Sequence, residues 1–119
     1  MNQNSLKRTE KFYFKILIEL IGSKWTIPTI FVLQHSSKRY SQIHKLVPET
    51  TQKVLTATLR KLQRNGIIFR TVHPTSPPQV EYQLSPMGIE LLDTIKNMTQ
   101  WAENNHQKIK RAQKAYDNE

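Results

Sequence analysis

The sequence predicts a mainly α-helical domain with one small β-hairpin, in the order helix, helix, helix, helix, hairpin, helix. Three observations lead to this fold class. Apolar residues recur at spacings of three and four in five segments, which is the period of a helix packed on one side. Residues 67–73 are instead rich in β-branched and aromatic residues, and 80–84 alternate apolar with polar side chains, as strands do. The prolines of 74–79 (PTSPPQ) interrupt this stretch, so two strands and a stiff loop form a hairpin, or wing.

The first helix is expected over residues 9–21, after a polar segment, 1–8, that is predicted to fray. Thr9 is the predicted N-cap, and Gly22 ends the helix. Its apolar residues surround most of the circumference and are Phe12, Tyr13, Phe14, Ile16, Leu17, Ile18, Leu20 and Ile21. Two interpretations remain open: a second subunit covers part of this surface, or the C-terminal helix of the same chain covers one side of it.

The next two helices are short. Residues 23–34 form the second, which starts near Thr26 because Pro28 is tolerated only in the first helical turn. The third covers 40–47 and cannot continue through Pro48. Its inward-facing residues are predicted to be Ile43, Leu46 and Val47.

Residues 50–66 form the helix around which the other elements are arranged. Thr50 or Thr51 is the N-cap, and Gly66 stands where a left-handed residue ends a helix. An apolar stripe at i, i+4 and i+7 consists of Leu55, Leu59 and Leu62. The opposite face has cations without a carboxylate to pair with them, and it consists of Lys53, Thr56, Ala57, Arg60 and Arg64. A plain solvated basic surface is the alternative interpretation of that face.

A long last helix begins with Ser85 as N-cap and Pro86 at its first position. Its apolar stripe consists of Ile89, Leu91, Leu92, Ile95, Met98, and Trp101 or Ala102. The domain is therefore expected over residues 9–105, followed by a polar C-terminal tail, 106–119. Two short helices, a turn, a basic-faced helix and a hairpin together make a single winged helix-turn-helix domain, with a two-fold dimer expected.

The net charge of +9 is unevenly distributed. Residues 36–73 carry eight basic and one acidic side chain, whereas 81–119 carry five and six. A localised positive field favours a polyanion such as nucleic acid, although an anionic membrane surface would attract it too. The chain has no cysteine, which excludes disulfides, thiolate metal sites and thiol-based sensing. No apolar run is long enough to span a bilayer and no secretory signal pattern occurs, so a soluble, cytoplasmic protein is expected.

An enzyme is not expected. The three glycines stand at element boundaries, which leaves no glycine-rich phosphate loop. The four histidines lack metal-ligand spacing, and no nucleophile, base and acid stand close together in sequence. No cofactor or metal is predicted.

Three segments resemble the HxlR-type family of bacterial winged-helix transcriptional regulators, which are relatives of the MarR group. They are IGSKWT (21–26), RYSQIHKLVPETTQKVLTATLRKLQRNGII (39–68) and RTVHPTSPPQVEYQLSPMG (70–88). The resemblance covers roughly residues 20–102, and its most specific part is the wing block. It implies a homodimer built through the first and last helices, with each recognition helix in a major groove and each wing beside the DNA backbone or minor groove.

Three positions depart from the family pattern. Many members have a cysteine near the position of Phe12, so thiol sensing is not carried over. Glu49 and Thr50 precede Thr51, where the family often has Gly-Ile, and a carboxylate there favours the helix dipole but opposes a nearby phosphate. Gln79 stands where a basic wing residue is common.

Candidate DNA contacts fall into three groups. The N-terminal half of a recognition helix meets base edges, which selects Gln52, Lys53, Thr56 and Arg60. Backbone phosphate contacts are predicted for Arg39, Tyr40, Ser41 and Thr51, although Ser41 and Thr51 could equally be plain N-caps and Tyr40 a packed aromatic. Wing candidates are Arg70, His73, Ser76 and Gln79, with Arg70 interpreted as a strand-edge charge rather than a base reader. Glu81 is expected to pair with a basic neighbour.

The predicted function is a sequence-specific, double-stranded DNA-binding transcriptional regulator that acts as a homodimer on a pseudo-palindromic operator. The alternative is a winged-helix module that binds a protein through its apolar surface and makes no base contacts. The expected partners are double-stranded DNA and a second copy of the chain, and no membrane association is expected. Binding of a small-molecule effector is left as an open alternative, because no residue of the sequence points to one.

Overall fold

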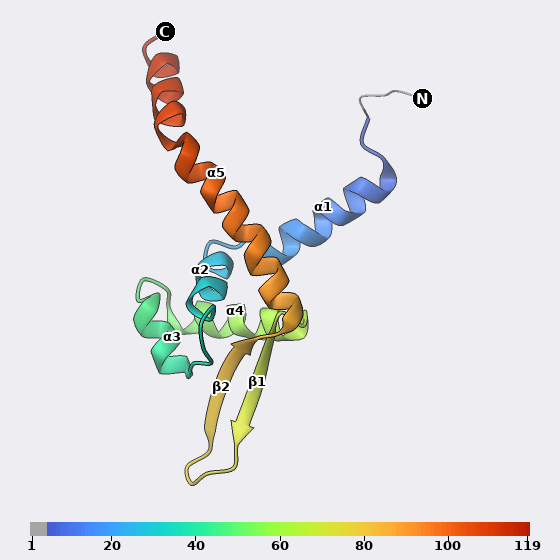
Figure 1. The fold of residues 1–119 in the computed structure, drawn as a ribbon, viewed down its shortest axis with the longest axis vertical. Coiled ribbons are helices and arrows are strands. Elements are labelled where there is room, and N and C mark those ends of the chain that lie inside the picture. The colour runs from blue at the N-terminus through green and yellow to red at the C-terminus, as the bar shows by residue number, and fades with distance from the viewer. Residues whose placement is uncertain (1–4) are drawn as a thin grey trace.

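The computed structural model describes residues 5–119 and has the predicted order of elements (Figure 1). The elements are α1 (Arg8–Ile21), α2 (Thr26–Val32), α3 (Tyr40–Leu46), α4 (Gln52–Arg64), β1 (Ile68–His73), β2 (Gln79–Leu84) and α5 (Pro86–Asp117). Helices α2, α3 and α4 gather into a lobe at the base of the hairpin, and α1 and α5 diverge from the opposite side of that lobe (Figure 1). Of the segment predicted to fray, residues 1–4 lie outside the described residues, and Arg8 is already helical.

The core lies where α2, α3, α4, the hairpin base and the start of α5 meet. Its buried residues are Ile30, Leu33, Ile43, Val47, Leu55, Leu59, Leu62, Ile67, Ile68, Leu84, Leu92 and Ile95. The predicted leucine stripe of α4 is confirmed, since all three leucines are at most 2% exposed. The inward prediction for Leu46 is wrong, because that side chain is 55% exposed. Ile43 is the buried residue of α3, and Val47, just past the end of the helix, is buried through a non-helical backbone that turns it inward.

Two of the predicted N-caps are confirmed by their hydrogen bonds. The Thr51 hydroxyl accepts from the backbone N–H of Val54 at 3.1 Å, which fixes the start of α4 and decides between Thr50 and Thr51. The Ser85 hydroxyl accepts from the Gly88 N–H at 3.0 Å, and Pro86 occupies the first turn of α5.

Two other N-caps were predicted wrongly. Helix α1 starts after Lys7, whose backbone is extended, so Thr9 lies inside the first turn. Helix α3 starts after Arg39, so Ser41 is likewise in the first turn rather than at the cap. The side chain of Gln42 accepts from the Arg39 N–H at 2.9 Å, which satisfies the backbone group that a capping box would bind. The start of α3 is therefore fixed by Gln42, which binds the backbone N–H of Arg39, and not by the hydroxyl of Ser41.

Gly66 ends α4 in the left-handed conformation, with φ of 74°, as predicted. The Ile67 N–H donates to the Leu62 carbonyl at 2.9 Å and the Gly66 N–H to Gln63 at 3.0 Å, which is the pattern of a Schellman motif. This turn directs the chain from α4 straight into β1.

Replacing Gly66 by alanine is expected to lower the free energy of unfolding by about 1 to 2 kcal/mol, because a Cβ disfavours the left-handed region. Urea denaturation measures the change. Gly66→Asn serves as the comparison, since asparagine tolerates this conformation better, and it should lose less. Equal losses for the two variants would show that crowding rather than backbone strain limits this position.

The hairpin pairs β1 with β2 in antiparallel register, with Ile68 opposite Leu84 at the buried base and His73 opposite Gln79 near the tip. Strand β2 begins at Gln79, so the predicted loop 74–79 is one residue shorter. A short segment before α3 extends the sheet, because Lys38 and Tyr82 exchange backbone hydrogen bonds of 2.9 and 2.8 Å. The wing is therefore fastened to the helix-turn-helix at its base.

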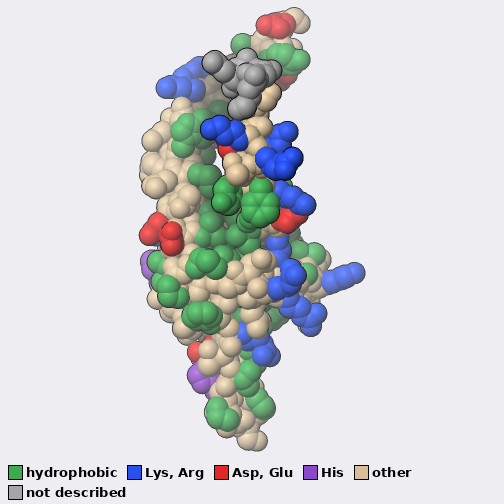
Figure 2. Space-filling model, turned by 90° about the vertical axis from the view of Figure 1, so that its right-hand side faces the viewer, with side chains coloured by type: hydrophobic (Ala, Val, Ile, Leu, Met, Phe, Trp, Pro, Cys, Tyr) green, Lys and Arg blue, Asp and Glu red, His purple; other side chains and the backbone are tan. Residues whose placement is uncertain are grey.

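Helix α1 has no buried residue in the single chain. The second interpretation of its apolar surface is therefore wrong, since α5 of the same chain diverges from α1 and does not cover it (Figure 1). Helix α5 continues to Asp117, so most of the segment predicted as a separate polar tail, 106–119, is part of one long helix. On the face that carries α1, hydrophobic side chains gather in a band beside Lys and Arg side chains (Figure 2).

Candidate nucleic-acid interface

The outward face of α4 forms a shallow hollow. It is lined by Thr51, Gln52, Lys53, Thr56, Ala57 and Arg60. All of them are exposed except Thr56, which is half-buried. The buried leucine stripe holds this helix against the lobe, so the opposite face is presented to solvent without a need for further support.

Two further hollows flank this one. The first lies between α3 and the start of α4 and is lined by Tyr40, Ser41, His44, Lys45, Pro48 and Gln52. The second lies between α4 and the hairpin, has a volume of about 340 Å³, and is lined by Tyr40, Thr56, Leu59, Arg60, Gln63, Arg70 and Tyr82. Because neighbouring hollows share lining residues, they form one continuous surface. Eight of the twelve predicted contact residues, all but Arg39, His73, Ser76 and Gln79, line it.

The continuous surface carries positive charge that no acidic side chain neutralises. Within residues 5–119, salt bridges occur at Lys15–Glu19 on α1 and at His73–Glu81 on the hairpin, and none involves a cation of the three hollows. Lys53, Arg60 and Arg70 therefore keep their full charge for a bound anion.

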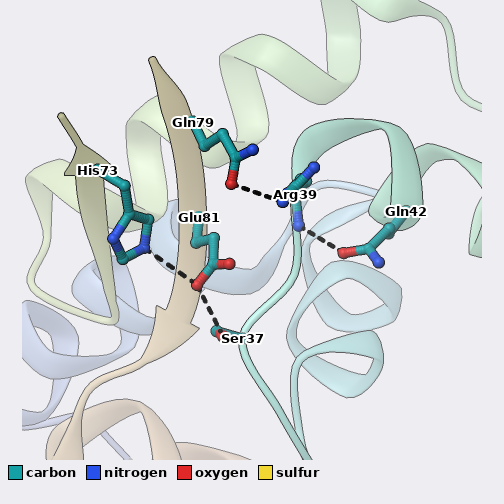
Figure 3. Close-up of polar contacts among 6 residues, drawn as sticks. All are labelled: Ser37, Arg39, Gln42, His73, Gln79 and Glu81. Atoms are coloured by element: carbon teal, nitrogen blue, oxygen red, sulfur yellow. Dashed lines mark hydrogen bonds and ion pairs between the residues drawn. The ribbon is translucent and has the colours of Figure 1, made fainter. Parts of the chain in front are cut away.

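A separate polar cluster lies on the other face of the hairpin (Figure 3). Arg39 donates to the side-chain oxygen of Gln79 at 2.6 Å, and Glu81 accepts from the Ser37 hydroxyl at 3.1 Å. His73 Nε2 lies 3.3 Å from a Glu81 oxygen, which confirms the prediction that Glu81 pairs with a basic neighbour. Arg70 is three residues from His73 along β1, so its side chain points to the opposite face. The predicted wing residues are thus divided between two faces.

Residues 20–110 match the model of the HxlR-like helix-turn-helix family. The chain belongs to this family. Its winged-helix geometry and its relatives identify it as a DNA-binding transcriptional regulator.

Relatives of this HxlR-like protein agree in sequence and in structure. The uncharacterized HTH-type transcriptional regulator YdeP of Bacillus subtilis is 38% identical over 103 residues, which span 84% of this chain and 80% of YdeP. A protein named as a MarR-family transcriptional regulator of Enterococcus faecalis V583 superposes with a TM-score of 0.77 at 28% identity, covering 92% of this chain and 99% of that one. The redox regulator HypR in its reduced form gives a TM-score of 0.77 at 30% identity, over 83% and 98% of the two chains.

The continuous surface of this HxlR-like protein also includes residues that the sequence analysis did not single out. Lys45, Gln63 and Tyr82 line the hollows although none was predicted. Lys45 is an exposed cation on α3, so its charge was a signal in the sequence that could have predicted a contact with DNA. Gln63 and Tyr82 carried none, because their position depends on how the hairpin docks against α4. Tyr40 is packed, with its hydroxyl donating to the Gln52 carbonyl at 3.1 Å.

A larger hollow of this HxlR-like protein, about 750 Å³, lies away from the recognition surface. It is bounded by α1, the end of α4 and the first turns of α5, and its apolar lining includes Ile16, Leu20, Ile67, Met87 and Leu91. Within residues 5–119, no group of His, Asp or Glu side chains is arranged to hold a metal ion. No helix in the same range combines the length and apolar character that crossing a bilayer demands.

Proposed function

We propose that this regulator binds a pseudo-palindromic operator as a homodimer, with half-sites about one helical turn apart. The observation that carries the proposal is the outward face of α4, where unneutralised cations and short polar side chains stand on a helix fixed by a buried leucine stripe. A polyanion with grooves wide enough for a helix is the ligand that such a surface fits.

Base readout is assigned to the first two turns of α4. Gln52 and Lys53 are exposed there, and Thr56 presents a methyl and a hydroxyl one turn later. Glutamine pairs with adenine, lysine with guanine, and a threonine methyl with the thymine methyl group. Positioning on the backbone falls to Ser41 and Lys45, which lie on the adjoining hollow of α3.

Contact with the second subunit is assigned to the apolar surfaces of α1 and α5. Phe12, Tyr13 and Ile18 of α1 are each at least 59% exposed, and Trp101 of α5 is 61% exposed. Large apolar side chains exposed in such number are costly in water and mark an interface. Two-fold symmetry of the dimer then matches the two half-sites of the operator.

Salt titration separates this function from that of a protein-binding module without base contacts. If α4 and its neighbours neutralise backbone phosphates, the logarithm of the association constant should fall with the logarithm of salt concentration by about 0.9 per phosphate contacted. Binding to a duplex selected from random sequences is the measurement. A flat salt dependence together with tight binding of a protein partner would support the module instead.

Lys53→Ala is expected to weaken binding to the selected duplex by about 1 to 3 kcal/mol, because this exposed cation loses its contact in the groove. Mobility-shift assays measure the loss, and the melting temperature should stay unchanged. Lys96→Ala is the matched control, since Lys96 is an exposed lysine on α5 outside the three hollows. Equal binding by the Lys53 and Lys96 variants would remove Lys53 from the interface.

A further inference from the structure

We propose that the hollow between α4 and the hairpin is a phosphate site, in which Arg60 and Arg70 together hold one phosphodiester group of the DNA backbone. The inference rests on the proposed DNA binding and adds a ligand and a role to residues that the sequence placed differently. Arg60 was expected to read a base, and Arg70 to be a strand-edge surface charge. Both line the same 340 Å³ hollow, one from the recognition helix and one from β1.

The first argument is electrostatic. Two arginines line one small hollow, and no carboxylate within residues 5–119 lies within 4.0 Å of the guanidinium group of either. Like charges held together raise the energy of the free protein, and an anion between them replaces repulsion by two attractions. Guanidinium groups also match the geometry of phosphate oxygens, with paired N–H donors in one plane.

The second argument concerns the remaining lining of the hollow. Thr56, Gln63 and Tyr82 bring neutral hydrogen-bonding side chains, and Leu59 forms part of the wall. No acidic residue is among the lining residues. A phosphodiester has oxygens that accept hydrogen bonds and none that donate, so donors without carboxylates are the chemistry that it requires.

The third argument is the position of the hollow relative to the groove. Thr56, Arg60 and Gln63 lie at i, i+4 and i+7, so they form the edge of the outward face of α4 that borders the hairpin. Arg70 is paired with Tyr82 across the two strands, which fixes its place beside that side of the helix. With the N-terminal half of α4 in the major groove, the space between helix and wing meets the sugar–phosphate edge of the duplex.

The recognition helix and the wing are then joined through a single DNA group. The wing base is already tied to the segment before α3 by the Lys38–Tyr82 backbone pair. A phosphate held from both sides fixes the depth at which Gln52 and Lys53 enter the groove without reading sequence itself.

The test compares Arg70→Gln with Arg64→Gln in the full-length chain. Arg64 is an exposed arginine at the end of α4 that lies outside the phosphate hollow, so it controls for the loss of one positive charge. Arg70→Gln should weaken binding to a selected duplex and to a random duplex by the same factor, roughly tenfold, and reduce the salt slope by about 0.9. Arg64→Gln should change both much less. Arg70→Lys should keep the slope and recover part of the affinity, because lysine retains the charge but not the paired donors.

A neutral methylphosphonate scanned along the duplex backbone identifies the phosphate. At one position the methylphosphonate should weaken DNA binding by the parent protein and leave binding by the Arg70→Gln protein unchanged. At the same position its effect on binding should not add to that of Arg60→Gln. Loss of affinity confined to the selected duplex would show that Arg70 reads a base, and an Arg70→Gln protein that binds like the parent would show that the hollow is empty in the complex. Either result overturns the proposal. If Lys53→Ala still weakens binding in that case, DNA binding by α4 stands and the phosphate site alone fails.

Inorganic phosphate distinguishes a backbone site from a site for a free anion. Side-chain N–H signals of Arg60 and Arg70 are followed by NMR as inorganic phosphate is added, with Arg64 as the reference. A saturable shift that duplex DNA reverses supports a shared site on the DNA path. A saturable shift that persists in the DNA complex would assign the hollow to a free anion and overturn the backbone assignment.

Discussion

Leu59→Ala is expected to lower the free energy of unfolding by about 2 to 5 kcal/mol, because it deletes buried methyl groups and leaves a cavity under the recognition helix. Leu59 is 2% exposed and belongs to the core between Leu55 and Leu62. A loss of this size is a large fraction of the stability of a small domain. Chemical denaturation followed by circular dichroism measures it.

The neighbouring residue on the helix supplies the control for this prediction. Arg60→Ala changes the same helix but removes an exposed side chain, so its unfolding curve should coincide with that of the parent. The two variants therefore separate stability from binding on adjacent positions. A Leu59→Ala protein that unfolds like the parent would show that packing of the leucine stripe does not stabilise the core.

The parts of the fold that could be predicted depend on short-range signals. The stripe of α4 repeats every three to four residues, and Gly66 and Ser85 mark helix ends through their own backbone and hydroxyl chemistry. Such signals act within a few residues, so the sequence carries them completely. The same locality explains the wrong N-caps, since Thr9 and Ser41 have suitable side chains but the extended backbone that a cap needs lies two residues earlier.

The candidate site could be predicted only in part, because its shape is a long-range property. The exposed side of α4 follows from helix periodicity alone, and Lys53 lies where that periodicity puts it. The hollow shared by Arg60 and Arg70 forms only when β1 docks beside α4, and the turn at Gly66 sets that angle. The division of Arg70 and His73 between two hairpin faces follows from strand alternation, but which face meets α4 does not.

Disrupting the apolar surface of α1 is expected to have the largest effect on DNA binding. In a double variant, Leu17→Glu with Ile18→Glu, two side chains that are 43% and 67% exposed in the single chain become charged. The lobe should keep its own stability, since neither side chain belongs to its core. Burial of two carboxylates at a subunit interface is strongly unfavourable, so the dimer should dissociate into monomers.

A monomer binds one half-site and loses the effective concentration that links two recognition helices, which is worth roughly a factor of 10² to 10⁴ in affinity for the full operator. Light scattering gives the mass, and mobility shifts on full and half operators give the affinities. Half-site binding should change far less than full-site binding, because α4 is untouched. Ser23→Glu with Ser36→Glu adds the same charge at exposed positions outside α1, α5 and the three hollows, and controls for repulsion from DNA. If the α1 variant stays dimeric and binds the full operator like this control, the subunits meet elsewhere, and the apolar surface of α1 requires a different partner.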